Sequence, residues 1–115
     1  MTPADPFALL LLLLAGHALC DYPLQGDFLA RMKDPRSDIG ARLWPHGLAA
    51  HALIHGGMVT ALTGSSILGL GEAVAHAWTD YAKCRGWLSF NQDQACHVAC
   101  KVVWWALVLV AEGRL

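Results

Sequence analysis

Charged residues are scarce in this 115-residue chain, at 15% of the total, and the two signs nearly cancel to a net charge of −1. Nucleic-acid-binding domains carry a basic stripe or patch, and none is present here. Nucleic acid is therefore excluded as a partner. Cysteines are also few, and they form neither a C-x-x-C motif nor the spacing of a secreted disulfide framework. We expect buried free thiols at Cys20, Cys84, Cys96 and Cys100.

Common catalytic motifs are missing as well. The chain has no Ser-His-Asp elbow, no glycine-rich phosphate loop and no cysteine-nucleophile signature. No lysine or arginine precedes the leucine run at 9–14, and Leu19 before Cys20 does not suit small-residue processing. We therefore interpret the first hydrophobic segment as a membrane helix and not as a signal peptide.

Hydrophobic residues, by contrast, make up 56% of the chain, and the mean hydropathy is +0.41. A soluble protein this small needs a larger polar surface. Hydrophobic stretches of 17–21 residues, each near the ~20 residues that cross a bilayer as a helix, predict a single all-α domain over 1–115. We expect an up-down bundle of four transmembrane helices, with the third short or broken at Gly69 and Gly71. These stretches cover residues 7–24, 43–63, 66–83 and 93–112.

The loops between these stretches predict an orientation. Basic residues lie in the first loop and in the loop after Lys83, whereas near the termini we find Arg114 alone. Positive residues favour the cytoplasmic side of a membrane. The sequence therefore predicts a bacterial inner-membrane protein with periplasmic termini, and Asn91 or Asp93 as the cap of the last helix.

Imidazoles and carboxylates recur inside the apolar stretches at a spacing of four residues. Residues four apart lie on one helix face, with Cβ atoms roughly 5–6 Å apart, which is a chelating distance. In an up-down bundle all of these pairs reach the same depth near the inner face. The pairs are His17/Asp21, His51/His55, His76/Asp80 and Asp93/His97.

Buried polar groups are costly unless they pair with one another or bind an ion. Imidazole and carboxylate ligands on several helices suit Zn²⁺ best, with Mn²⁺ or iron as alternatives. Eight candidate ligands exceed the need of one ion, so the site holds one or two divalent ions, or some of these groups orient the true ligands. The competing interpretation is a hydrogen-bonded network that fixes helix register.

Further polar residues lie beside the predicted site. Gln25 and Gln94 are placed by helical spacing to orient a ligand or a water molecule. Lys83 is either an interfacial anchor or a charge that binds an anionic substrate group or pairs with Asp80. Glu72 is expected near the opposite interface. A carboxylate of Asp21, Asp80 or Asp93 is the expected general base.

Four local strings carry a resemblance to a known family: His17-x3-Asp21-Tyr-Pro-Leu-Gln25, His51-x3-His55, His76-x3-Asp80-x2-Lys83 and Asp93-Gln94-x2-His97. In order and spacing the chain resembles domain of unknown function 3307, a family of small bacterial and phage membrane proteins, over roughly residues 8 to 110. The resemblance implies a multi-pass membrane protein and places the family's polar motif at the residues of these four strings. It supplies no reaction. A more distant similarity is to inner-membrane proteins described as predicted metal-dependent hydrolases.

These observations predict a membrane-embedded, metal-dependent hydrolase acting on a lipid or lipid-linked ester or phosphoester. One alternative is a protein that binds or relays ions or protons without catalysis. Another is a phage-encoded protein that modulates a membrane complex, in which the polar cluster stabilises the bundle. Self-association into a homo-oligomer is a further expectation.

Overall fold

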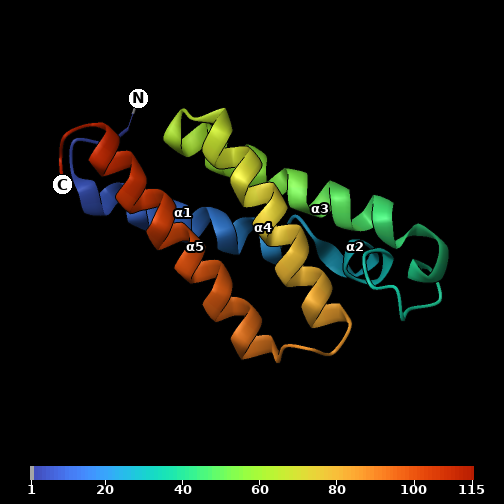
Figure 1. Cartoon of the computed structure of the whole chain (residues 1–115). Helices are drawn as coiled ribbons and strands as arrows, with labels where there is room; N and C mark the ends of the chain where they lie inside the picture. Colours follow the sequence, from blue (N-terminus) through green and yellow to red (C-terminus); the bar gives the residue numbers. More distant parts are fainter. Residues whose placement is uncertain (1) are drawn as a thin grey trace.

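A computed structural model describes residues 2–115, and these residues are all-α, with no strand (Figure 1). Four long helices form the body of the molecule and one short helix lies in a connection. The helices are α1 (Pro6–Asp21), α2 (Gly26–Met32), α3 (Gly40–Thr63), α4 (Ser66–Cys84) and α5 (Phe90–Ala111).

The four long helices alternate in direction, so both termini lie at one end of an elongated molecule of 48 × 22 × 22 Å (Figure 1). Hydrogen bonds tie the termini together, since the Arg114 guanidinium donates to the Ala4 carbonyl and Thr2 donates to Glu112. The first halves of α1 and α4 therefore share this end with the second halves of α3 and α5. The opposite end holds α2 and the α4–α5 loop.

The expected polar loop after the first helix contains the short helix α2, which the sequence analysis missed. Pro23 follows α1 and cannot donate a backbone hydrogen bond, and Gly26 adopts a positive φ of 62°. The chain consequently turns by 81° between α1 and α2. A Cβ on Gly47 of α3 would lie 2.7 Å from the Met32 carbonyl carbon, so this glycine lets the end of α2 lie directly against α3.

Helices α3 and α4 pack most closely where glycines face each other. A Cβ on Gly56 would lie 2.6 Å from the Gly69 carbonyl oxygen, and a Cβ on Gly69 would lie 1.8 Å from Thr60 Oγ1. The expectation that the third hydrophobic stretch is short or broken at its glycines is wrong. Gly69 serves close helix packing, and α4 runs without interruption from Ser66 to Cys84.

The cap of α5 also differs from the expectation. Ser89 caps the helix, and its hydroxyl accepts from the Gln92 backbone while the Gln92 side chain accepts from the Ser89 backbone. This capping box satisfies two backbone donors at once. Neither Asn91 nor Asp93 is the cap, and Asp93 is thereby free to point into the bundle.

The outer surface of the long helices is apolar. Large hydrophobic side chains are exposed on all four, among them Leu11, Leu53, Trp78 and Val102. Within the described residues, α5 is long and apolar enough to cross a membrane by itself, and α1 with α2 passes the same test as one bent pair. The other two expected spans, α3 and α4, do not meet this test.

Candidate metal centre

The interior of the half of the bundle farthest from the termini is polar, whereas the other half is apolar. Leu9, Leu13, Val59 and Val108 form a core cluster near the termini. Toward the other end, histidine, acidic and lysine side chains are each at most 5% exposed. These buried polar residues are His17, Lys33, His51, His55, Glu72, His76, Asp80, Asp93, His97 and Lys101.

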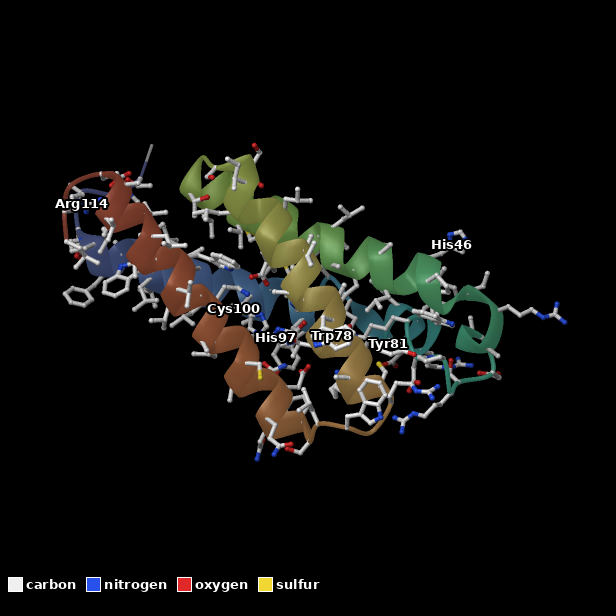
Figure 2. All side chains as sticks on the ribbon, in the orientation of Figure 1. His46, Trp78, Tyr81, His97, Cys100 and Arg114 are labelled. Carbon is white, nitrogen blue, oxygen red and sulfur yellow. The ribbon has the colours of Figure 1, made fainter. Side chains whose placement is uncertain are left out.

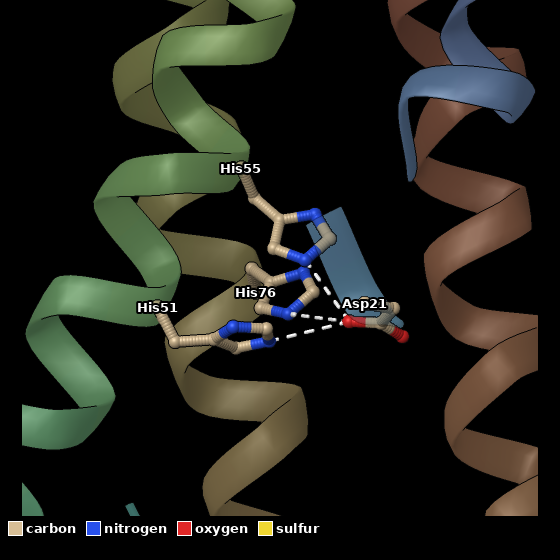
Figure 3. A group of neighbouring side chains, drawn as sticks. All are labelled: Asp21, His51, His55 and His76. Carbon is tan, nitrogen blue, oxygen red and sulfur yellow. Dashed lines mark hydrogen bonds and ion pairs between the residues drawn. The ribbon is translucent and has the colours of Figure 1, made fainter. Parts of the chain in front are cut away.

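Asp21 lies at the centre of this interior, at the end of α1, and three histidine side chains converge on it (Figure 3). Its Oδ1 atom lies 3.2 Å from Nε2 of His51, 3.0 Å from Nε2 of His55 and 3.8 Å from Nε2 of His76. His51 and His55 share one face of α3, while His76 comes from α4. One ligand atom from each of these four residues fits within 4.8 Å of the others, which suits a single metal ion.

Gln94 connects this group to α5. Its amide nitrogen donates to Asp21 at 2.8 Å and to Asp93 at 3.2 Å, and its oxygen lies 3.0 Å from His17 Nε2. The amide therefore holds the second oxygen of Asp21 and leaves the first oxygen facing the histidines. This is the orienting position that the sequence predicted for Gln94.

A second set of donors lies on the other side of His76. The His97 ring stacks on His76 with centroids 4.0 Å apart, and His97 Nε2 lies 3.1 Å from Asp93 Oδ1. His76, Asp80 and His97 also meet the distance criterion for a metal ion. The eight predicted ligands thus form one continuous cluster, and their role as ligands stays a prediction.

Two lysines distinguish Asp80 from Asp21. Lys33 Nζ donates to Asp80 Oδ2, and Lys83 Nζ lies 3.3 Å from Asp80 Oδ1 and 4.0 Å from Asp93. The predicted pairing of Lys83 with Asp80 is therefore observed. Lys33 is one of the basic residues of the first loop, but the end of α2 carries it inside, where its side chain is 3% exposed.

Glu72 and Lys101 form another buried ion pair that the sequence analysis did not identify. Lys101 Nζ donates to Glu72 Oε1 at 2.5 Å, and Trp104 Nε1 donates to Oε2 at 2.6 Å. Glu72 Oε1 also lies 3.4 Å from His76 Nδ1. The expectation that Glu72 lies near the opposite interface is wrong. Its four-residue spacing to His76 was the signal that could have placed it.

Other residues lie outside the cluster. Gln25 follows the end of α1, and its buried Oε1 has no hydrogen-bond partner among residues 2–115, so its predicted orienting role has no contact to support it. His46 is exposed on the outer side of α3 (Figure 2). Cys20 and Cys84 are buried free thiols as expected, but Cys96 is exposed and Cys100 half-buried, because both lie on the outward side of α5.

Two comparisons with known proteins returned nothing. No curated protein and no solved structure matches this chain. A family model described as a protein of unknown function matches residues 9–113, which include every residue of the cluster. The chain therefore belongs to the DUF3307 family.

Proposed function

We propose that this protein is a membrane-embedded, metal-dependent hydrolase of a lipid or lipid-linked ester or phosphoester. The observation that carries the proposal is the convergence of three imidazole Nε2 atoms on one oxygen of Asp21, at 3.0–3.8 Å. Ligand atoms at 2.0–2.1 Å around a tetrahedral Zn²⁺ are separated by about 3.3 Å. The distances from Asp21 Oδ1 to the three nitrogens are close to this value, and all four ligand atoms lie within 4.8 Å of one another, which supports a zinc ion at this position.

The pattern of charges supports a cation at Asp21 in particular. Each of the other buried carboxylates lies within 4.0 Å of a lysine: Glu72 beside Lys101, and Asp80 and Asp93 beside Lys83. Among residues 2–115, no lysine or arginine lies that close to Asp21. A buried carboxylate without a counter-charge is costly, and a divalent cation would supply that charge.

The same lysines favour one ion over two. Asp80 belongs to the second donor group but is already paired with Lys33 and Lys83, so a second dication there would face two ammonium groups. In the group built on Asp21, by contrast, no lysine or arginine among residues 2–115 lies within 4.0 Å of the carboxylate. We therefore assign the metal to Asp21, His51, His55 and His76.

A bound divalent ion would polarise a phosphoryl or carbonyl oxygen and increase the acidity of a water molecule. Of the carboxylates predicted as general base, Asp93 fits best, because Asp21 belongs to the metal group and Asp80 is held by Lys33. Asp93 contacts His97 at 3.1 Å, and the side chain of Lys83 beside it is 26% exposed. Lys83 is therefore placed to bind an anionic group of a substrate that enters from that side.

The distribution of polarity supports the proposed membrane location. Charged and imidazole groups fill half of the interior while large apolar side chains cover the exterior, which is the reverse of a water-soluble protein. An apolar groove of about 450 Å³ on the outer side of α3 and α4 is lined by Trp44, Trp78 and Tyr81, among others. These features support lipid as the surrounding medium and as the substrate class.

Metal analysis of the detergent-purified protein tests the proposal. We expect about one Zn²⁺ per chain in the wild type, and loss of that ion in His51→Ala and in His55→Ala. His46→Ala is the matched control, because this exposed histidine on the same helix contacts none of the cluster. Absence of stoichiometric metal from the wild type, or equal metal in all variants, would overturn the metal site.

Catalysis needs a separate measurement. Purified protein incubated with extracted membrane lipids should release a fatty acid from an ester, or phosphate or a headgroup from a phosphoester, and removal of the metal by a chelator should stop the release. Metal binding without any product would favour the alternative, a protein that binds ions without catalysis. That alternative is supported by a continuous series of contacts between titratable groups, each 3.2–3.8 Å long. The series runs from Lys83 through Asp80, His51 and Asp21 to His76.

A further inference from the structure

The two ring nitrogens of His76 face two different carboxylates. Nε2 points toward Asp21 at 3.8 Å, and Nδ1 lies 3.4 Å from Glu72 Oε1. Both nitrogens are buried and neither has a well-aligned hydrogen-bond partner among residues 2–115. A neutral imidazole carries one proton, so whichever nitrogen donates leaves the other with a free lone pair.

Glu72 is itself held firmly in place. Lys101 donates to the oxygen that faces His76, and Trp104 donates to the other oxygen. Glu72 and Lys101 are each 1% exposed. The ammonium group keeps the carboxylate negative, so it acts as a hydrogen-bond acceptor for His76 and not as a donor.

From this geometry we infer that Glu72 is a positioning residue for the metal site. Its Oε1, 3.4 Å from Nδ1, is placed to accept the Nδ1 proton of His76, which would favour the tautomer whose Nε2 lone pair faces Asp21 and the metal. Lys101 and Trp104 position Glu72 in turn. The inference rests on the proposed metal site. It assigns a function to a buried ion pair that, among residues 2–115, makes no hydrogen bond or ion pair with any predicted ligand other than His76.

Helical spacing explains why these residues meet. Glu72 and His76 are four residues apart on α4, while Lys101 and Trp104 are three apart on α5, so each pair shares one helix face. Carboxylate partners of metal-bound histidines raise ligand basicity and fix ring orientation, and their loss typically lowers metal affinity by about 10–100-fold.

The test is the metal affinity of Glu72→Gln combined with Lys101→Met. The double substitution removes the carboxylate together with its counter-charge, so no unpaired charge is left buried. We expect Zn²⁺ affinity, measured by competition with a chromophoric chelator, to decrease by about 10–100-fold. The visible absorption spectrum of the Co²⁺-loaded protein should change as well, because His76 is no longer held as a ligand.

Two single substitutions at adjacent tryptophans test the inference even if the double variant does not fold. Trp104 donates to Glu72, whereas Trp105 donates to the Pro6 carbonyl at the other end of the molecule. Trp104→Phe should lower Zn²⁺ affinity and alter the Co²⁺ spectrum, and Trp105→Phe should change neither.

The outcomes separate this inference from the proposed function. A wild-type protein that binds no metal would refute the metal site itself. A wild-type protein that binds Zn²⁺, together with unchanged affinity and spectrum in the folded double variant and in Trp104→Phe, would refute the role of Glu72 alone. If the double variant does not fold, the two tryptophan variants decide.

Discussion

The four buried carboxylates of the cluster differ in their partners, and this difference assigns their roles. Lysine ammonium groups lie beside Glu72, Asp80 and Asp93, while Asp21 is surrounded by imidazoles and the Gln94 amide. A lysine-paired carboxylate is balanced in the absence of metal. Under the proposed function the charge of Asp21 is balanced by the bound cation, so we expect metal binding and folding to depend on different carboxylates.

Asparagine substitutions at Asp21 and Asp80 should therefore have different effects, the first on metal binding and the second on stability. Asp21→Asn removes the charge that the metal balances, so we expect loss of bound Zn²⁺ with a folded protein. Asp80→Asn leaves Lys33 buried without its counter-charge, which should lower the free energy of unfolding by about 3–5 kcal/mol. Metal analysis and denaturation in detergent measure the two effects. Loss of stability in Asp21→Asn without loss of metal would contradict this assignment.

Among the elements, the α3–α4 pair determines the geometry of the site. α3 carries His51 and His55 and α4 carries His76. The two helices lie in close contact at Gly56, directly after His55, and at Gly69, about two turns before His76. Any side chain at this contact would push the helices apart. The distances between the imidazoles on α3 and the imidazole on α4 should increase with that separation.

Alanine at Gly69 should accordingly damage both stability and metal binding. Its Cβ would lie 1.8 Å from Thr60 Oγ1, and such overpacking typically costs about 1–3 kcal/mol. Gly57→Ala is the matched control, because a Cβ there meets nothing within 4 Å and alanine favours the helix by about 0.5–1 kcal/mol. Thermal unfolding and Zn²⁺ affinity of both variants check this. Equal behaviour of the two would contradict the packing argument.

At the scale of the whole molecule, the interior is divided into a polar half and an apolar half, and this division indicates whether ions could pass through the protein. Contacts between titratable groups extend from Lys83 to Lys101, and the cluster of Leu9, Leu13, Val59 and Val108 fills the bundle toward the termini. A path for ions would have to cross this apolar half without polar groups. The architecture therefore favours a site reached from one side.

Two measurements test this description of the whole molecule. The protein should stay in the membrane fraction after an alkaline carbonate wash, because its apolar exterior has no favourable contact with water. Reconstituted in liposomes, it should pass neither protons nor Zn²⁺. Release by carbonate would contradict the membrane proposal, and a metal or proton flux would favour the ion-relay alternative. The predicted homo-oligomer could be measured on the same detergent sample.

The local pattern of the sequence was enough to predict much of the site. Four-residue spacing placed each His/Asp pair on one helix face, and alternating helix direction placed all pairs at one level. Those inferences need only helical periodicity and short connections. The helical segments were predicted from hydrophobic stretches of suitable length. The short turn at Gly64 was predicted by the gap between the second and third stretches.

Tertiary structure alone decided which acid meets which base. Lys33 and Glu72 were misplaced by the sequence because burial of a charge depends on a partner from another helix, and helix rotation is not encoded in local spacing. The same holds for α2, whose close contact with α3 at Gly47 carries Lys33 inward. The sequence determined the donors of the cluster. The packing of the helices pairs three of the four carboxylates with lysine and leaves Asp21 without one, which is why we propose the cation there.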